Sequence, residues 1–196
     1  PTVLLLDEPL GALDLKLREQ MKIQLKQLQH QIGTTFIYIT HDQSEALVMS
    51  DQVAVMNFGE LLQVGTPDEL YSHPVDTFVA SFVGENNGFS GVITEISEDR
   101  AVLDVGAFQI RSKLHPKMEV GQTFLNFIRP EKMNLLPVDS SEPEPANQVP
   151  GIIQDVIFDG AVARAIVELV GGQDVMVLIT RTSDTSLPVA GENVKV

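Results

Sequence analysis

The sequence contains no cysteine, so disulfide bonds and thiolate metal sites are excluded. It also lacks long apolar runs. The longest, such as Val3–Leu6, have the length of one buried strand and fall well short of the ~18 residues of a membrane-spanning helix. Positive charge is scarce, with 13 basic against 27 acidic residues and a net charge of −14. Because such a chain repels phosphate backbones, no nucleic-acid partner is expected. Because no apolar run is long enough to span a membrane, any membrane role must act through a partner protein.

The 196 residues have an ordinary globular balance of 43% hydrophobic and 20% charged side chains, enough for one large or two small domains. No signal peptide is visible. The first residue is Pro1 rather than Met, and it stands just before a strand-like run. We therefore expect the sequence to be a piece of a longer protein.

The first part of the chain alternates strand-like and helix-like segments, as α/β folds do. Short apolar or β-branched runs predict three parallel strands over residues 2–6, 34–40 and 53–56. The turn at residues 57–60 predicts a hairpin that returns through Leu61–Val64.

Residues that favour helix starts stand before the helical segments. Asp14 is expected to cap a helix over residues 15–31. An apolar stripe on this helix is formed by Leu17, Met21, Leu25 and Leu28. Asp42 and Glu45 have the form of a capping box at the start of a short helix, and Thr66 begins another.

The pattern changes after Gly84, where short strands alternate with turns and no helical period follows. Strands are expected over residues 91–96, 101–105, 108–111, 123–128, 133–135, 151–158, 161–169, 174–179 and 193–196. The polar, proline-rich stretch Asp139–Pro150 is expected to be a flexible loop. The sequence therefore predicts an α/β part with parallel strands and helices over residues 1–84. An all-β, OB-like domain of two interleaved β modules is expected over residues 85–196.

Two acidic residues, Asp7 and Glu8, end the first predicted strand. Ligands of α/β sheets bind at the carboxyl ends of strands, so Asp7 is well placed to hold Mg²⁺, which prefers oxygen ligands. Glu8 can orient or deprotonate a water that attacks a γ-phosphate. The alternative is that the two acids form a plain solvated turn.

The next predicted strand ends at His41. If the two strands are neighbours, His41 and Glu8 line one crevice, and the imidazole can bind the γ-phosphate and hold the attacking water. The alternative is a partly buried histidine that caps the following helix. No role is expected for His30, His73 and His115, which lie in polar surroundings without an acid-tipped strand beside them.

Together these segments resemble the ATPase subunits of importer-type ABC transporters. Leu4–Asp14 resembles their Walker B motif and D-loop, and Ile39–Gln43 resembles their switch-histidine loop. Gly59–Pro67 resembles the segment that ends their catalytic domain, and Phe82–Asn86 resembles the junction beyond it. Ile128–Glu131 resembles a marker of their TOBE-type regulatory extension. Leu13–Met21 and Glu45–Asp51 are similar to the polyamine-importing branch of this family.

The resemblance implies a role for each matching residue. Asp7 would be the magnesium-binding aspartate of Walker B, Glu8 the catalytic glutamate and His41 the switch histidine. Asp14 would be the D-loop aspartate, which acts across a head-to-tail dimer of two ATPase subunits. The implied cofactors are ATP and Mg²⁺. The implied partners are a second ATPase subunit, transmembrane permease subunits and, indirectly, a solute-binding protein, at the cytoplasmic face of the bacterial inner membrane.

Neither a G-x-x-x-x-G-K-[ST] phosphate loop nor an LSGGQ-type signature occurs in the sequence. Because that loop supplies the phosphate cradle and its lysine, this chain alone is expected neither to bind ATP tightly nor to hydrolyse it. Its incomplete sheet is expected to expose apolar surface and to self-associate.

The sequence leaves two alternative functions open. One is a non-catalytic regulatory or dimerisation β module that senses a small molecule. The other is a DNA-repair ATPase with the same Walker B and switch histidine. The segment Arg129–Glu131 and the net charge of −14 argue against the DNA-repair enzyme.

Overall fold

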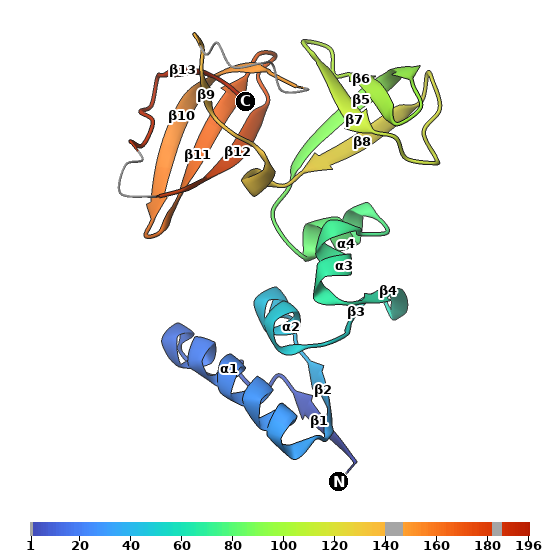
Figure 1. Ribbon diagram of the computed structural model, residues 1–196, viewed down its shortest axis with the longest axis vertical. Helices are drawn as coiled ribbons and strands as arrows, with labels where there is room; N and C mark the ends of the chain where they lie inside the picture. The colour runs from blue at the N-terminus through green and yellow to red at the C-terminus, as the bar shows by residue number, and fades with distance from the viewer. Residues whose placement is uncertain (1, 140–146, 182–185) are drawn as a thin grey trace. The chain divides into compact units, whose positions relative to one another are not determined.

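The computed structural model describes residues 2–139, 147–181 and 186–196. The chain divides into two compact units, Pro1–Gly84 and Glu85–Val196 (Figure 1). In the described part of the chain, no helix is both long enough and apolar enough to cross a bilayer.

The first unit alternates strands with helices. Its elements are β1 (Val3–Asp7), α1 (Leu15–Ile32), β2 (Thr35–Ile39), α2 (Gln43–Met49), β3 (Val53–Asn57), β4 (Glu60–Gly65), α3 (Pro67–Ser72) and α4 (Thr77–Phe82). β1 and β2 run parallel, and their register places Asp7 beside Ile39. A parallel pair with helices is what the sequence predicted for this part of the chain.

The expectation of a third parallel strand is wrong. β3 pairs with β4 in an antiparallel hairpin, and the sheet of β1 and β2 has no third strand among the residues described. The turn between β3 and β4 has positive φ at both central residues, 47° at Phe58 and 83° at Gly59. A two-residue type I′ turn needs this geometry, and it returns the chain directly alongside β3.

The helix caps agree with the sequence at α1 and differ at α2. The backbone N–H of Leu17 donates to Asp14 Oδ1 at 3.0 Å, as expected for an N-cap aspartate. At α2 the N–H of Glu45 donates to Asp42 Oδ1 at 3.1 Å, but the reciprocal bond of a capping box is missing. Instead the Thr40 hydroxyl bonds to the Glu45 carboxylate at 2.7 Å and accepts from the Asp42 N–H at 3.0 Å. The Thr40 hydroxyl therefore bridges the Asp42 N–H and the Glu45 carboxylate, which a capping box would join directly.

The second unit is almost entirely β-structure. Its elements are β5 (Asn87–Ile96), β6 (Arg100–Asp104), β7 (Gln109–Lys113), β8 (Thr123–Ile128), the 3₁₀ turn η1 (Pro130–Lys132), β9 (Leu136–Pro137), β10 (Pro150–Asp159), β11 (Val162–Leu169), β12 (Asp174–Thr180) and β13 (Asn193–Lys195). The strand expected at residues 133–135 is wrong: the chain forms η1 and then the short β9. Residues 140–146 of the expected loop lie outside the described ranges.

The two sheets of this unit are built alike. One has the order β7-β6-β5-β8, and the other has β12-β11-β10-β13 with β9 added at its edge. Each sheet has a bulge at the same place, after Ile93 in β5 and after Ile153 in β10. The residues Asn87–Gly91 correspond one by one to Asn147–Gly151. This unit therefore contains two copies of one four-stranded module, β5–β8 and β10–β13, each made from one continuous stretch of chain.

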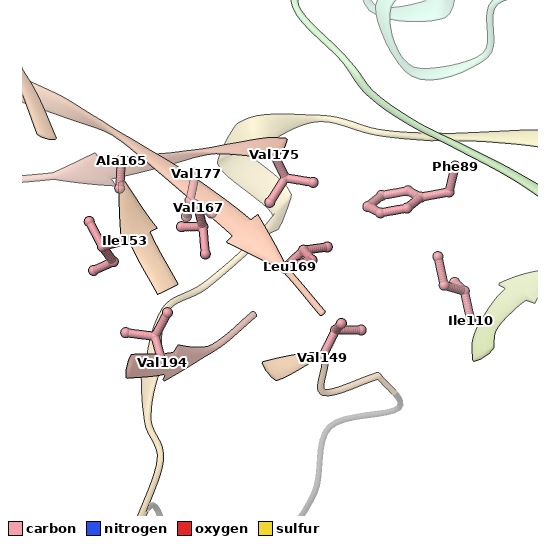
Figure 2. Packing of buried hydrophobic residues seen from close by; sticks show 10 residues of the cluster. All are labelled: Phe89, Ile110, Val149, Ile153, Ala165, Val167, Leu169, Val175, Val177 and Val194. Atoms are coloured by element: carbon pink, nitrogen blue, oxygen red, sulfur yellow. The ribbon is translucent and has the colours of Figure 1, made fainter. Parts of the chain in front are cut away.

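A single apolar cluster joins the two modules. Phe89 and Ile110 come from the first module, and they pack with buried side chains of the second (Figure 2). The second module and the segment that leads into it contribute Val149, Ile153, Ala165, Val167, Leu169, Val175, Val177 and Val194. This cluster packs one end of the first module against the second, while the first module keeps a separate core of Ile93, Ala101, Leu103 and Met118. The strand content of the unit agrees with the predicted OB-like, all-β class.

Candidate functional site

β1 and β2 end side by side, and a predicted site residue follows each strand. The backbone N–H of Glu8 donates to the carbonyl of Ile39, the last residue of β2, at 2.8 Å. Two residues beyond Ile39, the Nδ1 atom of His41 lies 2.9 Å from Glu8 Oε1. The parallel pairing therefore brings Glu8 and His41 into direct contact, although 33 positions separate them in the sequence.

This contact is open to solvent. The side chains of His41 and Glu8 are 78% and 55% exposed. A pair as exposed as this adds at most about 1 kcal/mol to stability, so the fold does not depend on it. Glu8 also has a φ of 43°, in the left-handed region that non-glycine residues seldom adopt. An exposed pair on strained backbone is typical of a site kept for chemistry rather than for packing.

Asp7 lies at the last position of β1 and is exposed. Among the residues that the structure describes, no group of three or more His, Asp or Glu could hold a metal ion by itself. A single strand-end carboxylate nevertheless fits Mg²⁺, which often takes one or two carboxylates from a protein and its other ligands from phosphates and water. The donor set therefore suits magnesium bound together with a phosphate ligand.

Asp14 lies at the start of α1, where its Oδ1 caps the helix. Within the described ranges, no hydrogen bond joins its side chain to Glu8 or His41. The structure thus brings together two of the four predicted site residues, sets Asp7 beside them in the chain, and gives Asp14 a capping role.

Sequence reasoning missed the basic face of α1. The expected apolar stripe is only partly covered, since Leu17 and Leu28 are 40% and 42% exposed, whereas the side chain of Lys22 is buried at 1%. The available signal was a basic residue at every fourth position, Arg18, Lys22 and Lys26. Residues four apart share one face of a helix.

One family model matches the β-rich part of the chain. The profile of the TOBE domain matches residues 127–196, within the β-rich unit.

Relatives match across nearly the whole chain. The spermidine/putrescine import ATP-binding protein PotA of Thermobifida fusca is 40% identical over 188 residues, covering 95% of this chain and 48% of its own. The protein of the same name from Fusobacterium nucleatum is 53% identical over 137 residues, covering 69% of this chain and 36% of its own. Over most of its length the chain is therefore similar to import ATP-binding proteins of the ABC type, and the relatives named here are spermidine/putrescine members of that group. It spans less than half the length of either relative.

Proposed function

We infer that the protein containing this chain hydrolyses ATP to energise import of a solute. The observation that carries this proposal is the 2.9 Å contact between His41 Nδ1 and Glu8 Oε1 at the ends of two parallel strands. A carboxylate beside an imidazole, next to a strand-end aspartate, is a suitable set of groups for moving a proton near a magnesium-bound phosphate. Similarity to an import ATP-binding protein over 95% of the chain supports the same conclusion.

Each residue has a role that its position allows. Glu8 accepts the proton of the attacking water, or orients that water, with its exposed carboxylate. His41 keeps Glu8 in place through Nδ1, which leaves Nε2 to face the γ-phosphate; both nitrogens donate when the ring is protonated. Asp7 would hold Mg²⁺ through its carboxylate. When bound, Mg²⁺ neutralises charge on the phosphate oxygens.

The other components follow from the family. Asp14 acts across the interface with a second copy of the ATPase subunit. That dimer works on transmembrane permease subunits at the cytoplasmic face of the inner membrane, with a solute-binding protein delivering the solute. We favour a polyamine as the solute, because the relatives are named for spermidine and putrescine.

The 196-residue chain itself is proposed to be inactive, because its sequence holds no phosphate loop. The test measures ATP turnover by the whole protein and by the purified 196-residue chain, and polyamine uptake by vesicles that contain the whole transporter. Turnover by the whole protein only, with ATP-dependent polyamine uptake, is expected. Robust turnover by the 196-residue chain would refute its inactivity, and a whole protein without turnover would refute the proposed function.

A further inference from the structure

Three basic side chains of α1 hold α2 and the residues that lead into it. Arg18 Nη1 lies 3.4 Å from Asp42 Oδ2, Lys22 Nζ donates to Ser44 Oγ at 2.7 Å, and Lys26 Nζ donates to the carbonyl of Val48 at 3.1 Å. The three donors are spaced four residues apart, so they lie on one face of α1. Their acceptors follow in the same order along the chain, from the N-cap of α2 to its last turn. We call Arg18, Lys22 and Lys26 the cation ladder.

The middle member of the cation ladder is buried. Lys22 is 1% exposed, and its ammonium also pairs with Glu19 Oε1 at 2.6 Å. A buried ammonium is costly unless it is well paired, so the two oxygens that it contacts are fixed relative to each other. One of them is the hydroxyl of Ser44, three residues after His41.

The first member of the cation ladder has a second contact. Arg18 Nη2 donates to the carbonyl of Leu13 at 3.0 Å, while Nη1 reaches Asp42, the residue after His41. A guanidinium is a rigid planar fork, so it fixes the spacing of its two acceptors better than a flexible ammonium does. Arg18 therefore ties the turn before α1, which continues the chain beyond Glu8, to the segment that carries His41.

We propose that Arg18 and Lys22 are positioning residues for the Glu8–His41 contact. They hold Asp42 and Ser44 against α1, and this keeps the His41 imidazole within hydrogen-bonding distance of Glu8. The contact between Glu8 and His41 needs such support, because an exposed pair of this kind contributes too little free energy to fix the two side chains by itself. The catalytic meaning of this inference rests on the proposed function, whereas its geometric content can be tested in this chain alone.

The geometric test is NMR spectroscopy of the ¹⁵N-labelled 196-residue chain. The chemical shift of His41 Nδ1 is measured in wild type, in Glu8→Gln as the reference without a carboxylate partner, and in Arg18→Met. In Arg18→Met the shift is expected to move from the wild-type value toward the Glu8→Gln value. Arg18→Lys should restore part of the difference. Lys16→Gln, which removes an exposed cation from the same helix, should leave the shift unchanged.

Two further variants keep the geometric test decisive if Arg18→Met disturbs folding. Asp42→Asn removes the charge opposite Arg18 but can still cap α2, and Lys22→Met keeps the length of the buried stem. Each should move the His41 shift in the same direction as Arg18→Met, while the amide signals of residues 85–139 stay in place. Wild-type His41 shifts in folded Arg18→Met, Asp42→Asn and Lys22→Met would overturn the inference.

The second test is steady-state ATP hydrolysis by the whole protein. Arg18→Met is expected to lower kcat roughly tenfold or more, because a displaced general base loses alignment with its water, while KM for ATP changes less than about twofold. If Glu8→Gln abolishes turnover and Arg18→Met keeps the wild-type kcat, the positioning role fails and the proposed function stands. If Glu8→Gln keeps full turnover, the proposed function fails whatever the NMR result.

Discussion

The side-chain amide of Asn87 pairs with the backbone of Met176 through two hydrogen bonds. The Met176 N–H donates to Asn87 Oδ1 at 2.8 Å, and Asn87 Nδ2 donates to the Met176 carbonyl at 2.7 Å. Asn87 begins β5 in the first module, and Met176 lies in β12 at the edge of the second. The amide thus acts as a short piece of backbone that covers one residue of an edge strand.

The same contact recurs in the opposite direction between the modules. The Arg111 N–H donates to Asn147 Oδ1 at 2.7 Å, and Asn147 Nδ2 donates to the Arg111 carbonyl at 2.9 Å. Asn147 corresponds to Asn87 in the alignment of the modules, and Arg111 lies in β7, the edge strand equivalent to β12. Each module therefore covers the edge of the other with its own asparagine.

Asn87 is expected to contribute more than Asn147 to the free energy of unfolding. Asn87 is 6% exposed, whereas Asn147 is only partly buried and its bonds are exposed. Asn87→Ala leaves a shielded N–H and carbonyl without partners, so it should lower the free energy of unfolding by about 1–3 kcal/mol. Asn147→Ala should cost less, because water can replace the lost bonds. Urea denaturation followed by circular dichroism measures both, and a larger loss for Asn147→Ala would contradict this account.

Acid should weaken the start of α3. The N–H and the hydroxyl of Thr66 both donate to Glu69 Oε2, at 2.8 and 3.1 Å, and these bonds lower the pKa of the Glu69 carboxyl below its ordinary value. A carboxyl with a lower pKa in the folded state adds stability above its unfolded pKa of about 4.3. That stability is lost as the pH falls through the folded-state value.

Glu69→Gln tests this dependence. The difference in unfolding free energy between wild type and Glu69→Gln should be largest at neutral pH and should shrink as the pH falls below about 4. Glu60→Gln, which changes an exposed carboxyl of β4, is the matched control. Urea titrations at a series of pH values provide the measurement, and a difference for Glu69→Gln that stays constant with pH would count against the Thr66–Glu69 hydrogen bonds as its cause.

The pair β1–β2 should make this chain associate with itself. Leu5 and Ile37 are register partners, and they are 61% and 49% exposed. Light scattering should therefore show an apparent mass that rises with concentration, and Leu5→Lys should reduce the rise. Val120→Lys alters a similarly exposed side chain in the second unit and should have little effect. A stable monomer at high concentration would show that this surface does not associate.

Much of this architecture could be predicted because local signals determine it. The apolar run that ends at Asp7 and the cap at Asp14 depend on neighbouring residues, and both lie where the sequence placed them. The contact between Glu8 and His41 could likewise be expected, once the strands that precede them were taken as neighbours.

Other features depend on contacts that residue patterns do not display. The hairpin of β3 with β4 was expected from the turn at residues 57–60, but the parallel placement of β3 was wrong, because an apolar run does not show which strand it pairs with. The burial of Lys22 was missed because a lysine is normally solvated, and its hydroxyl partner lies on another helix. The sequence indicated two β modules, but the strand-by-strand correspondence between them could not be read from it, because that correspondence is carried by register, with few identical residues.

The most direct test of the proposed role of Glu8 beside His41 is the kcat of ATP hydrolysis by the whole protein carrying Glu8→Gln. The glutamine keeps the size of Glu8 and can still bond to His41, but it cannot accept a proton from water. Glu8→Gln should lower kcat by about 100-fold or more, with ATP binding retained. A Glu8→Gln protein that turns over ATP at the wild-type rate would contradict the proposed role.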